Sequence, residues 1–122
     1  MSLRSAVRQA LASADQVADD EERVAAARVR GCSPVAELGN RRRGVAAGVL
    51  RSVVLRPREG VPTVEAELYD GSGSIDLVWL GRRTITGIEP GRRIRIEGMV
   101  CDVDGRRTVY NPRYELSPRA GE

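Results

Sequence analysis

Two stretches with strand periodicity flank a glycine-rich turn near the middle of the chain, and they constrain the fold more than any other feature. In residues 64–69 apolar and polar side chains alternate, as in a strand with one buried face. In residues 75–80 Ile75, Leu77 and Trp79 share one face. The intervening residues 70–73, Asp-Gly-Ser-Gly, are typical of a turn because glycine reaches positive φ at little steric cost. The pattern predicts a β-hairpin.

Further strand patterns lie on both sides of this hairpin. Residues 44–55 form a long apolar run with Gly48 in its middle, where a bulge would let one strand bend across both sides of a small barrel. Residues 92–101 alternate again, and Asp104-Gly105 is a strong hairpin signal before a fifth strand at 106–110. That strand is kinked at Asn111-Pro112, and residues 113–116 end the ordered part.

Five strands with a bulged first strand predict a mainly β protein, a five-stranded Greek-key OB barrel. The connector at residues 81–91 lies between the third and fourth strands and has room for one short helical turn. An SH3-like barrel is the main competitor, although it usually has shorter strands and places its short helical turn between the last two.

The N-terminal residues 3–29 are rich in alanine, contain no glycine or proline, and favour a helix. A thin apolar stripe runs along it at heptad spacing: Leu3, Val7, Ala10, Ala14, Val17, Val24 and Arg28. Glu21 interrupts this stripe. We expect the helix to pack against the barrel or another copy of the chain. The predicted organisation is a helical extension at 1–34, the barrel at 35–116 and a frayed tail at 117–122.

The composition excludes several kinds of chemistry. The 122 residues include no histidine and two cysteines, Cys32 and Cys101, which do not form a CxxC pair. Ordinary zinc sites, histidine acid–base catalysis and Ser-His or Cys-His nucleophile pairs are therefore excluded. We expect no cofactor, no metal and no enzymatic activity. No signal peptide or apolar run of membrane-spanning length is apparent, so the sequence favours a cytoplasmic protein with free thiols and no membrane partner.

The net charge of +3 is unevenly distributed. Residues 1–39 carry five arginines against six carboxylates, whereas residues 40–122 carry fifteen against eleven. All 20 basic residues are arginine, whose planar group suits phosphate binding and aromatic stacking. The basic character thus belongs to the β-rich part and is a mild indication of a polyanionic partner.

Three motifs carry a resemblance to a known family: ELYDGSGSIDLVWLG, GIEPGRRIRIEGMV and DGRRTVYNPRYEL. They resemble the anticodon-binding-type OB domains, in particular the wedge domain of RecG-type branched-DNA helicases, and most of all small stand-alone bacterial OB-fold proteins described as nucleic-acid binding. The resemblance covers about residues 35–116. Two positions depart from the helicase pattern: Leu80 followed by Gly81 stands where stacking aromatics follow the third strand, and Asn111 replaces a histidine. No helicase motor is present.

OB proteins bind nucleic acid on the outer face of strands two and three and on flanking loops. That face would present Thr63, Glu65, Glu67, Tyr69, Asp76, Val78 and Leu80, and its three carboxylates oppose phosphate binding. Better candidates for phosphates lie in the loops, the connector and beyond the last strand: Arg56, Arg58, Arg82, Arg83, Arg106, Arg107 and Arg113. The stacking candidates are Tyr69, Tyr110 and Tyr114, although the last two could instead seal the end of the barrel. Trp79 is expected in the core.

Other arginines are weaker candidates. The group Arg92, Arg93 and Arg95 is expected to include cross-strand partners for Glu97 and other carboxylates. The run at residues 41–43 is the densest basic cluster, and such a run at a strand entrance is usually solvated.

The sequence therefore predicts a non-catalytic protein that binds single-stranded or branched DNA or RNA with little sequence specificity. The alternative is a protein–protein interaction or assembly module that uses the barrel and the Ala-rich helix, including self-association through that helix, without nucleic acid. The acidic face and the few aromatic residues favour this alternative.

Overall fold

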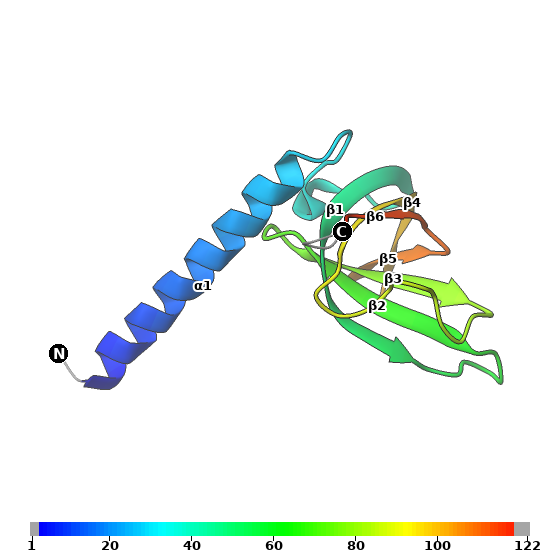
Figure 1. Cartoon of the computed structure of the whole chain (residues 1–122), viewed down its shortest axis with the longest axis horizontal. Coiled ribbons are helices and arrows are strands. Elements are labelled where there is room, and N and C mark those ends of the chain that lie inside the picture. The colour runs from blue at the N-terminus through cyan, green and yellow to red at the C-terminus, as the bar shows by residue number, and fades with distance from the viewer. Residues whose placement is uncertain (1–2, 119–122) are drawn as a thin grey trace.

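The computed structural model describes residues 3–118, in which one long helix precedes a six-stranded sheet that curls into a barrel (Figure 1). The helices are α1 (Leu3–Ala27) and the short 3-10 helix η1 (Val35–Glu37). The strands are β1 (Arg42–Leu55), β2 (Thr63–Tyr69), β3 (Ser74–Leu80), β4 (Arg93–Val103), β5 (Arg106–Tyr110) and β6 (Arg113–Leu116). The mainly β architecture with an N-terminal helix confirms the sequence prediction.

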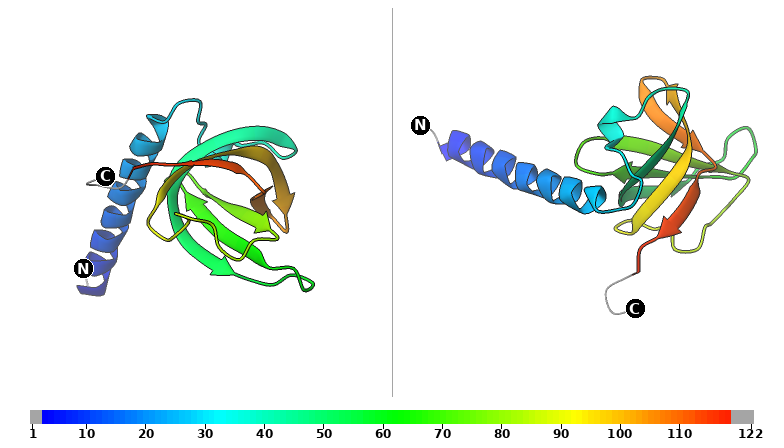
Figure 2. Two further views of the ribbon diagram at one scale, coloured as in Figure 1. Left: turned by 45° about the vertical axis from the view of Figure 1, so that its right-hand side comes forward. Right: turned by 90° about the horizontal axis from the view of Figure 1, so that it is seen from above.

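The barrel closes because β1 is long enough to pair with two strands. Residues 42–49 of β1 pair antiparallel with β4, and residues 49–55 pair antiparallel with β2. The ring is completed by antiparallel β2–β3, parallel β3–β5 and antiparallel β4–β5 pairings. Figure 2 shows β1 curving over the other strands.

The crossing point of β1 depends on Gly48. A Cβ atom at this position would lie 2.2 Å from the carbonyl oxygen of Tyr69. The register between β1 and β2 then shifts between Leu50 and Ser52. Because only glycine lets the two backbones approach so closely, Gly48 marks the place where β1 passes from one side of the barrel to the other.

The predicted hairpin is confirmed as β2 and β3. Its register partners on the buried face are Val64 with Trp79, Ala66 with Leu77 and Leu68 with Ile75. Trp79 is only 5% exposed, so the prediction that it belongs to the core is confirmed. Its indole N–H donates to the carbonyl of Pro112 at 3.3 Å, which satisfies the one polar group of the ring.

Two residues predicted on the outer face, Thr63 and Val78, are buried, although Val78 does lie on that face as the register partner of Glu65. Val78 is the register partner of Tyr110, so the neighbouring strand β5 lies alongside it. The Thr63 hydroxyl donates to the carbonyl of Val61 at 3.3 Å. The outer face is therefore narrower than strand alternation predicts.

The structure has six strands where the sequence predicts five. Asn111 has a φ of 50°, which interrupts the last strand between β5 and β6. Its N–H donates to the carbonyl of Val78 at 2.6 Å, and its side-chain oxygen accepts from the N–H of Leu80 at 3.0 Å. Because β5 and β6 both pair with β4, they behave as one strand broken by this corner.

The short helical turn lies elsewhere than predicted. Residues 81–92 contain turns but no helix, and they fill the core with Ile85 and Ile88. The short helix is η1, which precedes β1. Val35 of η1 is fully buried, and its N–H donates to the Asp70 carboxylate at 2.8 Å.

The Asp70 carboxylate joins η1 to the hairpin turn. Besides Val35, it accepts the N–H of Ser72 at 2.9 Å, the hydroxyl of Ser72 at 2.7 Å and the N–H of Gly73 at 3.1 Å. This residue is only 2% exposed. The turn predicted at residues 70–73 is thus confirmed, and its aspartate also fixes the segment that leads into β1.

The helix α1 extends away from the barrel (Figures 1 and 2). It ends at Ala27, two residues before the predicted end, and all of residues 3–18 are exposed. Contact with the barrel is limited to its C-terminal half, where Glu22 forms two 2.9 Å bonds with Arg93. A Cβ on Gly71 would lie 2.1 Å from the carbonyl oxygen of Asp19, so the helix backbone sits directly on the hairpin turn.

The predicted tail begins with Ser117, whose N–H donates to the carbonyl of Arg93 at 3.0 Å. Residues 119–122 lie outside the described residues, so the predicted fraying concerns residues of which nothing is described. Cys32 and Cys101 are free thiols, as expected. None of the helices in residues 3–118 is both long enough and apolar enough to span a membrane.

Replacement of Gly48 by alanine is expected to destabilise the barrel by about 2 kcal/mol, because the added methyl group collides with the β2 backbone. Urea unfolding followed by circular dichroism measures this change. G39A is the matched control, since a Cβ there would meet only the flexible side chain of Arg42 at 3.3 Å. Equal stability of the two variants would contradict the role assigned to Gly48.

Candidate nucleic-acid interface

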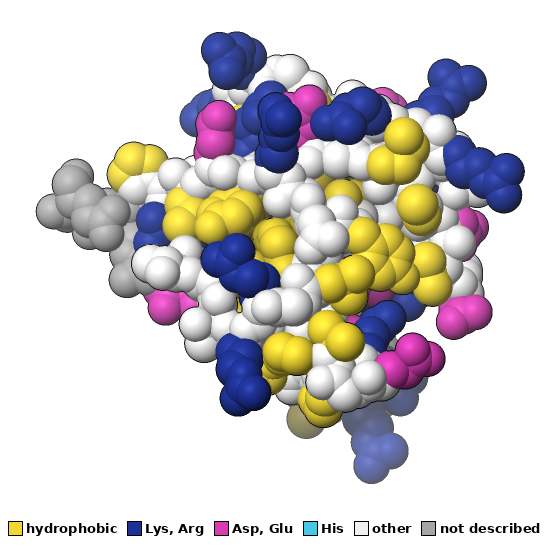
Figure 3. Space-filling view, turned by 90° about the vertical axis from the view of Figure 1, so that its right-hand side faces the viewer, with side chains coloured by type: hydrophobic (Ala, Val, Ile, Leu, Met, Phe, Trp, Pro, Cys, Tyr) yellow, Lys and Arg dark blue, Asp and Glu magenta, His cyan; other side chains and the backbone are white. Residues whose placement is uncertain are grey.

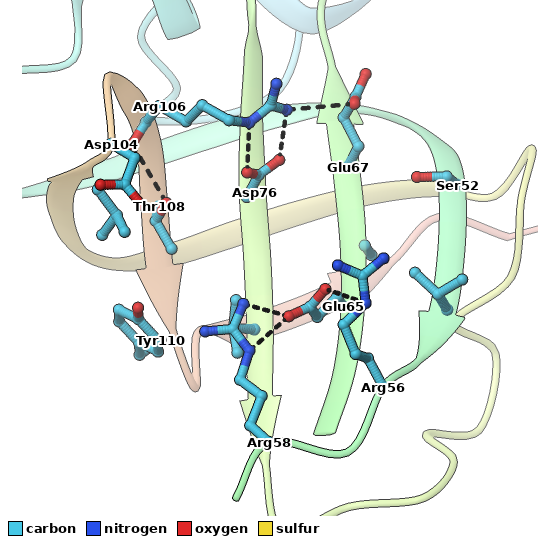
Figure 4. Close-up of a pocket in the computed structure, with 14 residues that line it drawn as sticks. Ser52, Arg56, Arg58, Glu65, Glu67, Asp76, Asp104, Arg106, Thr108 and Tyr110 are labelled. Carbon is cyan, nitrogen blue, oxygen red and sulfur yellow. Dashed lines mark hydrogen bonds and ion pairs between the residues drawn. The ribbon is translucent and has the colours of Figure 1, made fainter. Parts of the chain in front are cut away.

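The outer face of β2 and β3 forms the floor of an open groove of about 400 Å³ (Figure 4). Alternation along the strands points Glu65, Glu67 and Asp76 into this groove. Arginines reach it from both sides: two from the β1–β2 loop and one from β5. The three carboxylates of this face, which the sequence analysis expects to oppose phosphate binding, therefore have arginine neighbours.

The β1–β2 loop arginines pair with Glu65. Arg58 donates through Nε to Glu65 at 2.7 Å, and its terminal nitrogen makes a second, shorter contact with the same oxygen. Arg56 lies 3.6 Å from the other carboxylate oxygen. The bonds to Glu65 raise the pKa of Arg58 above its usual value. One carboxylate thus holds two of the predicted phosphate ligands.

Arg106 pairs with the carboxylates at the other end of the groove. Its Nε and terminal nitrogen donate to the two oxygens of Asp76 at 2.7 and 2.8 Å, a bidentate geometry. The terminal nitrogen also lies 3.5 Å from Glu67. Hydrogen bonding to Asp76 and the nearby charges raise the pKa of Arg106. Asp104 also lines the groove, so three arginines face four carboxylates and the groove carries no excess positive charge to attract a polyanion.

One end of the barrel gathers three segments that are distant in sequence. The N–H of Gly81 donates to the carbonyl of Pro62 at 2.8 Å, and Asn111 bonds both Val78 and Leu80. The β1–β2 loop, the end of β3 and the β5–β6 corner therefore adjoin one another. Figure 3 views the molecule from this end and shows a band of hydrophobic side chains with arginines around it.

Apolar groups are unusually exposed in these same segments: Leu55 56%, Val61 44%, Leu80 45%, Tyr110 39% and Tyr114 38%. In Figure 4 the Tyr110 ring lies beside the Arg58 guanidinium at the mouth of the groove. Tyr110 is the tyrosine best placed for stacking, since its ring is exposed and borders the groove.

Four arginines of the predicted set are without an ion pair in the part of the chain that the structure describes, and three of them, Arg82, Arg83 and Arg113, also lack the side-chain hydrogen bonds that hold Arg107. All three are exposed. They flank the segments that meet at this end, because Arg82 follows Gly81 and Arg113 follows the Asn111-Pro112 corner. Their charges are available to a ligand without first breaking a contact to a carboxylate.

Tyr114 has a mixed role. Its ring meets the buried Trp79 edge-on, with centroids 5.8 Å apart and planes at 81°. That contact makes it part of the seal over the barrel core, one of the two roles left open by the sequence. The remaining exposed part of the ring adds to the apolar surface of the barrel end.

Two predicted site residues lie elsewhere. Tyr69 is at the far end of β2, where the guanidinium of Arg51 stacks over its ring at 3.3 Å from the centroid. Arg107 points away from Arg106 and donates to the carbonyls of Leu38 and Ala36 at 3.3 and 2.9 Å. Arg107 thus supports η1. The contact between Arg51 and Tyr69 is one that no pattern in the sequence indicates.

The remaining arginine predictions need correction. Arg93 bonds Glu22 of α1, and Arg95 donates to the carbonyl of Arg30 at 3.1 Å, so neither pairs with Glu97. The helix and the segment after it approach this side of β4, which sequence alone does not reveal. Glu97 instead lies 3.6 Å from Arg43, a member of the run at 41–43.

Within residues 3–118 no group of three or more Cys, Asp or Glu side chains is arranged to hold a metal ion. The arginines, tyrosines and apolar groups at the barrel end are of the kinds that suit non-covalent binding of a polyanion with flat apolar parts.

No protein-family profile matches this sequence, and no curated protein matches it either. Several solved structures resemble the fold, including the following two. RecG bound to a three-way DNA junction is 21% identical with a TM-score of 0.51, over 65% of this chain and 11% of that chain. A Replication Protein A heterotrimer bound to single-stranded DNA is 17% identical with a TM-score of 0.49, over 63% of this chain and 58% of that chain. This chain thus spans less than two thirds of either. The RecG likeness and the ring of strands identify an OB-like barrel.

Arg107→Ala is expected to lower the free energy of unfolding by about 1 kcal/mol, because two carbonyls near η1 are deprived of a charged donor. Thermal or urea unfolding provides the measurement. Arg82→Ala is the control and should leave stability unchanged, since that side chain is exposed and has no ion pair within residues 3–118. If the two variants were equally stable, Arg107 would not support η1.

Proposed function

We propose that this protein is a non-catalytic OB-fold protein that binds single-stranded or branched DNA or RNA with little sequence specificity. The observation that mainly supports this proposal is the composition of the barrel end, where exposed tyrosine and aliphatic side chains adjoin Arg82, Arg83 and Arg113. Phosphates need cations that are not already neutralised, and bases need flat apolar surfaces. The barrel end supplies both.

Different residues bind the phosphates and the bases. Arg82, Arg83 and Arg113 neutralise phosphates, while Tyr110 stacks on a base beside the apolar Leu80. Arg56, Arg58 and Arg106 contribute only by exchanging a carboxylate partner for a phosphate, which weakens their net effect. RecG, of which 11% of the chain has a similar fold, was solved on a three-way DNA junction, and this supports including branched DNA among the ligands.

A cytoplasmic location is part of the same proposal. The two thiols are unpaired in the structure, which suits a reducing compartment. Burial raises the pKa of the Cys32 thiol, while Arg95 opposes the shift, so this thiol is less reactive than an exposed cysteine.

Fluorescence anisotropy with labelled oligo-dT, poly-U and a DNA fork tests the function at two salt concentrations. The affinity is expected to fall steeply with salt, since bound phosphates displace counterions. The double variant R82A/R83A should reduce the slope of log affinity against log salt by about 0.7 for each single-strand phosphate that is no longer neutralised. Tyr110→Ala should weaken binding by roughly 1–3 kcal/mol with little change in that slope.

The control for the arginine pair is R28A/R42A, which removes the same charge from exposed positions that are remote from the barrel end in sequence and without an ion pair in the described range. If this control weakened binding as much as R82A/R83A, the effect would reflect net charge alone. Absence of binding to all three ligands at low salt would refute the proposed function.

Glu65→Gln is expected to strengthen nucleic-acid binding and to steepen its salt dependence. The substitution removes the carboxylate that holds both Arg56 and Arg58, which frees two guanidinium groups at the mouth of the groove. The same anisotropy assay measures the gain. Glu59→Gln makes an equal charge change in the β1–β2 loop, and an equal gain there would show that Glu65 does not restrain these arginines.

A further inference from the structure

The first four turns of α1 have no partner in the structure. All residues from 3 to 18 are exposed, and among the larger apolar side chains Leu3 is 82%, Val7 50%, Leu11 61% and Val17 56% exposed. Figure 2 shows this part of α1 extending alone from the barrel. Most helical stability in proteins comes from packing of an apolar face, so an exposed apolar stripe indicates a missing partner.

The charges beside the stripe are segregated along the helix. Arg4, Arg8, Asp15 and Asp19 follow one another at spacings of four, seven and four residues, so they project from the same flank. The basic pair lies near the N-terminus and the acidic pair nearer the C-terminus. This order opposes the helix dipole, which favours acids at the N-terminal end. The pattern therefore does not serve the isolated helix.

None of these four side chains forms an ion pair within the residues that the structure describes. The acidic pair also borders an open groove of about 600 Å³ between α1 and the barrel. That groove leaves room for basic side chains of a partner to approach Asp15 and Asp19.

We propose that α1 pairs antiparallel with α1 of a second copy of this chain, which makes the protein a homodimer. In a two-fold antiparallel pair, each flank faces the same flank of the other helix running in the opposite direction. Arg4 and Arg8 then lie against Asp19 and Asp15 of the second copy. A parallel pair would instead place like charges at the same level.

The apolar stripe fits the same register. When Arg8 is level with Asp15 of the second copy, Val7 lies close to the level of Val17 and Ala10 close to that of Ala14. Leu11 approaches Leu11 of the second copy near the two-fold axis. Ala10 and Ala14 lie at the centre of the stripe. The two helix axes can therefore approach closely there, while the larger side chains pack on either side of the alanines.

Sedimentation velocity and light scattering over a range of protein concentrations test this pairing on the full chain. The wild type should pass from monomer to dimer, and the midpoint should shift to higher concentration as salt is added. A chain that remains monomeric at every accessible concentration overturns the proposal.

Two neighbouring positions provide a pair of variants, both exposed in the same helix. A10E places a charge in the stripe and should weaken dimerisation at least tenfold. Q9E adds the same charge on the side of the helix that faces away from both the stripe and the charged flank, and it should leave the dimer unchanged. If both or neither weakened association, or Q9E alone did, the stripe would not be the interface.

Charge exchange tests the antiparallel direction. Arg8→Asp and Asp15→Arg should each weaken association, because each brings like charges together. The double variant R8D/D15R should restore it, since both contacts are reversed in sign. Failure of the double variant to recover, while circular dichroism shows intact helix and barrel, would overturn the antiparallel register.

Discussion

The double use of β1 is the constraint on which the rest of the structure depends. One strand pairs with β4 along its first half and with β2 along its second, so the sheet closes without an exposed edge between them. The close approach of Gly48 to the β2 backbone permits this crossing. Closure in turn brings the β1–β2 loop, the end of β3 and the β5–β6 corner to one end of the barrel, where the candidate interface lies.

Charge pairing decides which parts of that surface can attract a polyanion. On the groove floor, Glu65, Glu67 and Asp76 hold three arginines that would otherwise be the most central phosphate ligands. Exposed ion pairs are individually weak, so a phosphate could replace the carboxylate at modest cost. Arg82, Arg83 and Arg113 need no such exchange. Under the proposed function, these three arginines would therefore determine the affinity, and the groove floor would contribute shape more than charge.

Local patterns in the sequence predicted the parts of the fold that depend on local geometry. The hairpin, the burial of Trp79 and the bend near Gly48 each follow from side-chain alternation or glycine conformation within a few residues. The parallel β3–β5 pairing and the two halves of the last strand depend on contacts between distant segments, so their details could not be read from short windows. The sixth strand arises because Asn111 adopts positive φ and uses its side chain to bond Leu80.

The site was predicted less completely than the fold, for physical reasons that differ from residue to residue. Arg106 and Arg107 are adjacent on a strand and must point to opposite sides, so they could not both belong to one surface. The pairing of Arg58 with Glu65 depends on how the loop returns, which the sequence does not specify. Arg93 and Arg95 face the segment around α1, whose position depends on tertiary packing alone.

The helix and the barrel end assume complementary roles when the two proposals are combined. Antiparallel pairing through residues 3–19 places the two barrels at opposite ends of a helical rod, because each barrel follows the C-terminal end of its own helix. Two sequence-tolerant surfaces held at a fixed separation bind one strand or one junction as a bivalent unit, and the second contact forms at high effective concentration. Weak contacts at each barrel end then suffice for stable binding, which fits a surface whose central arginines are already paired with carboxylates.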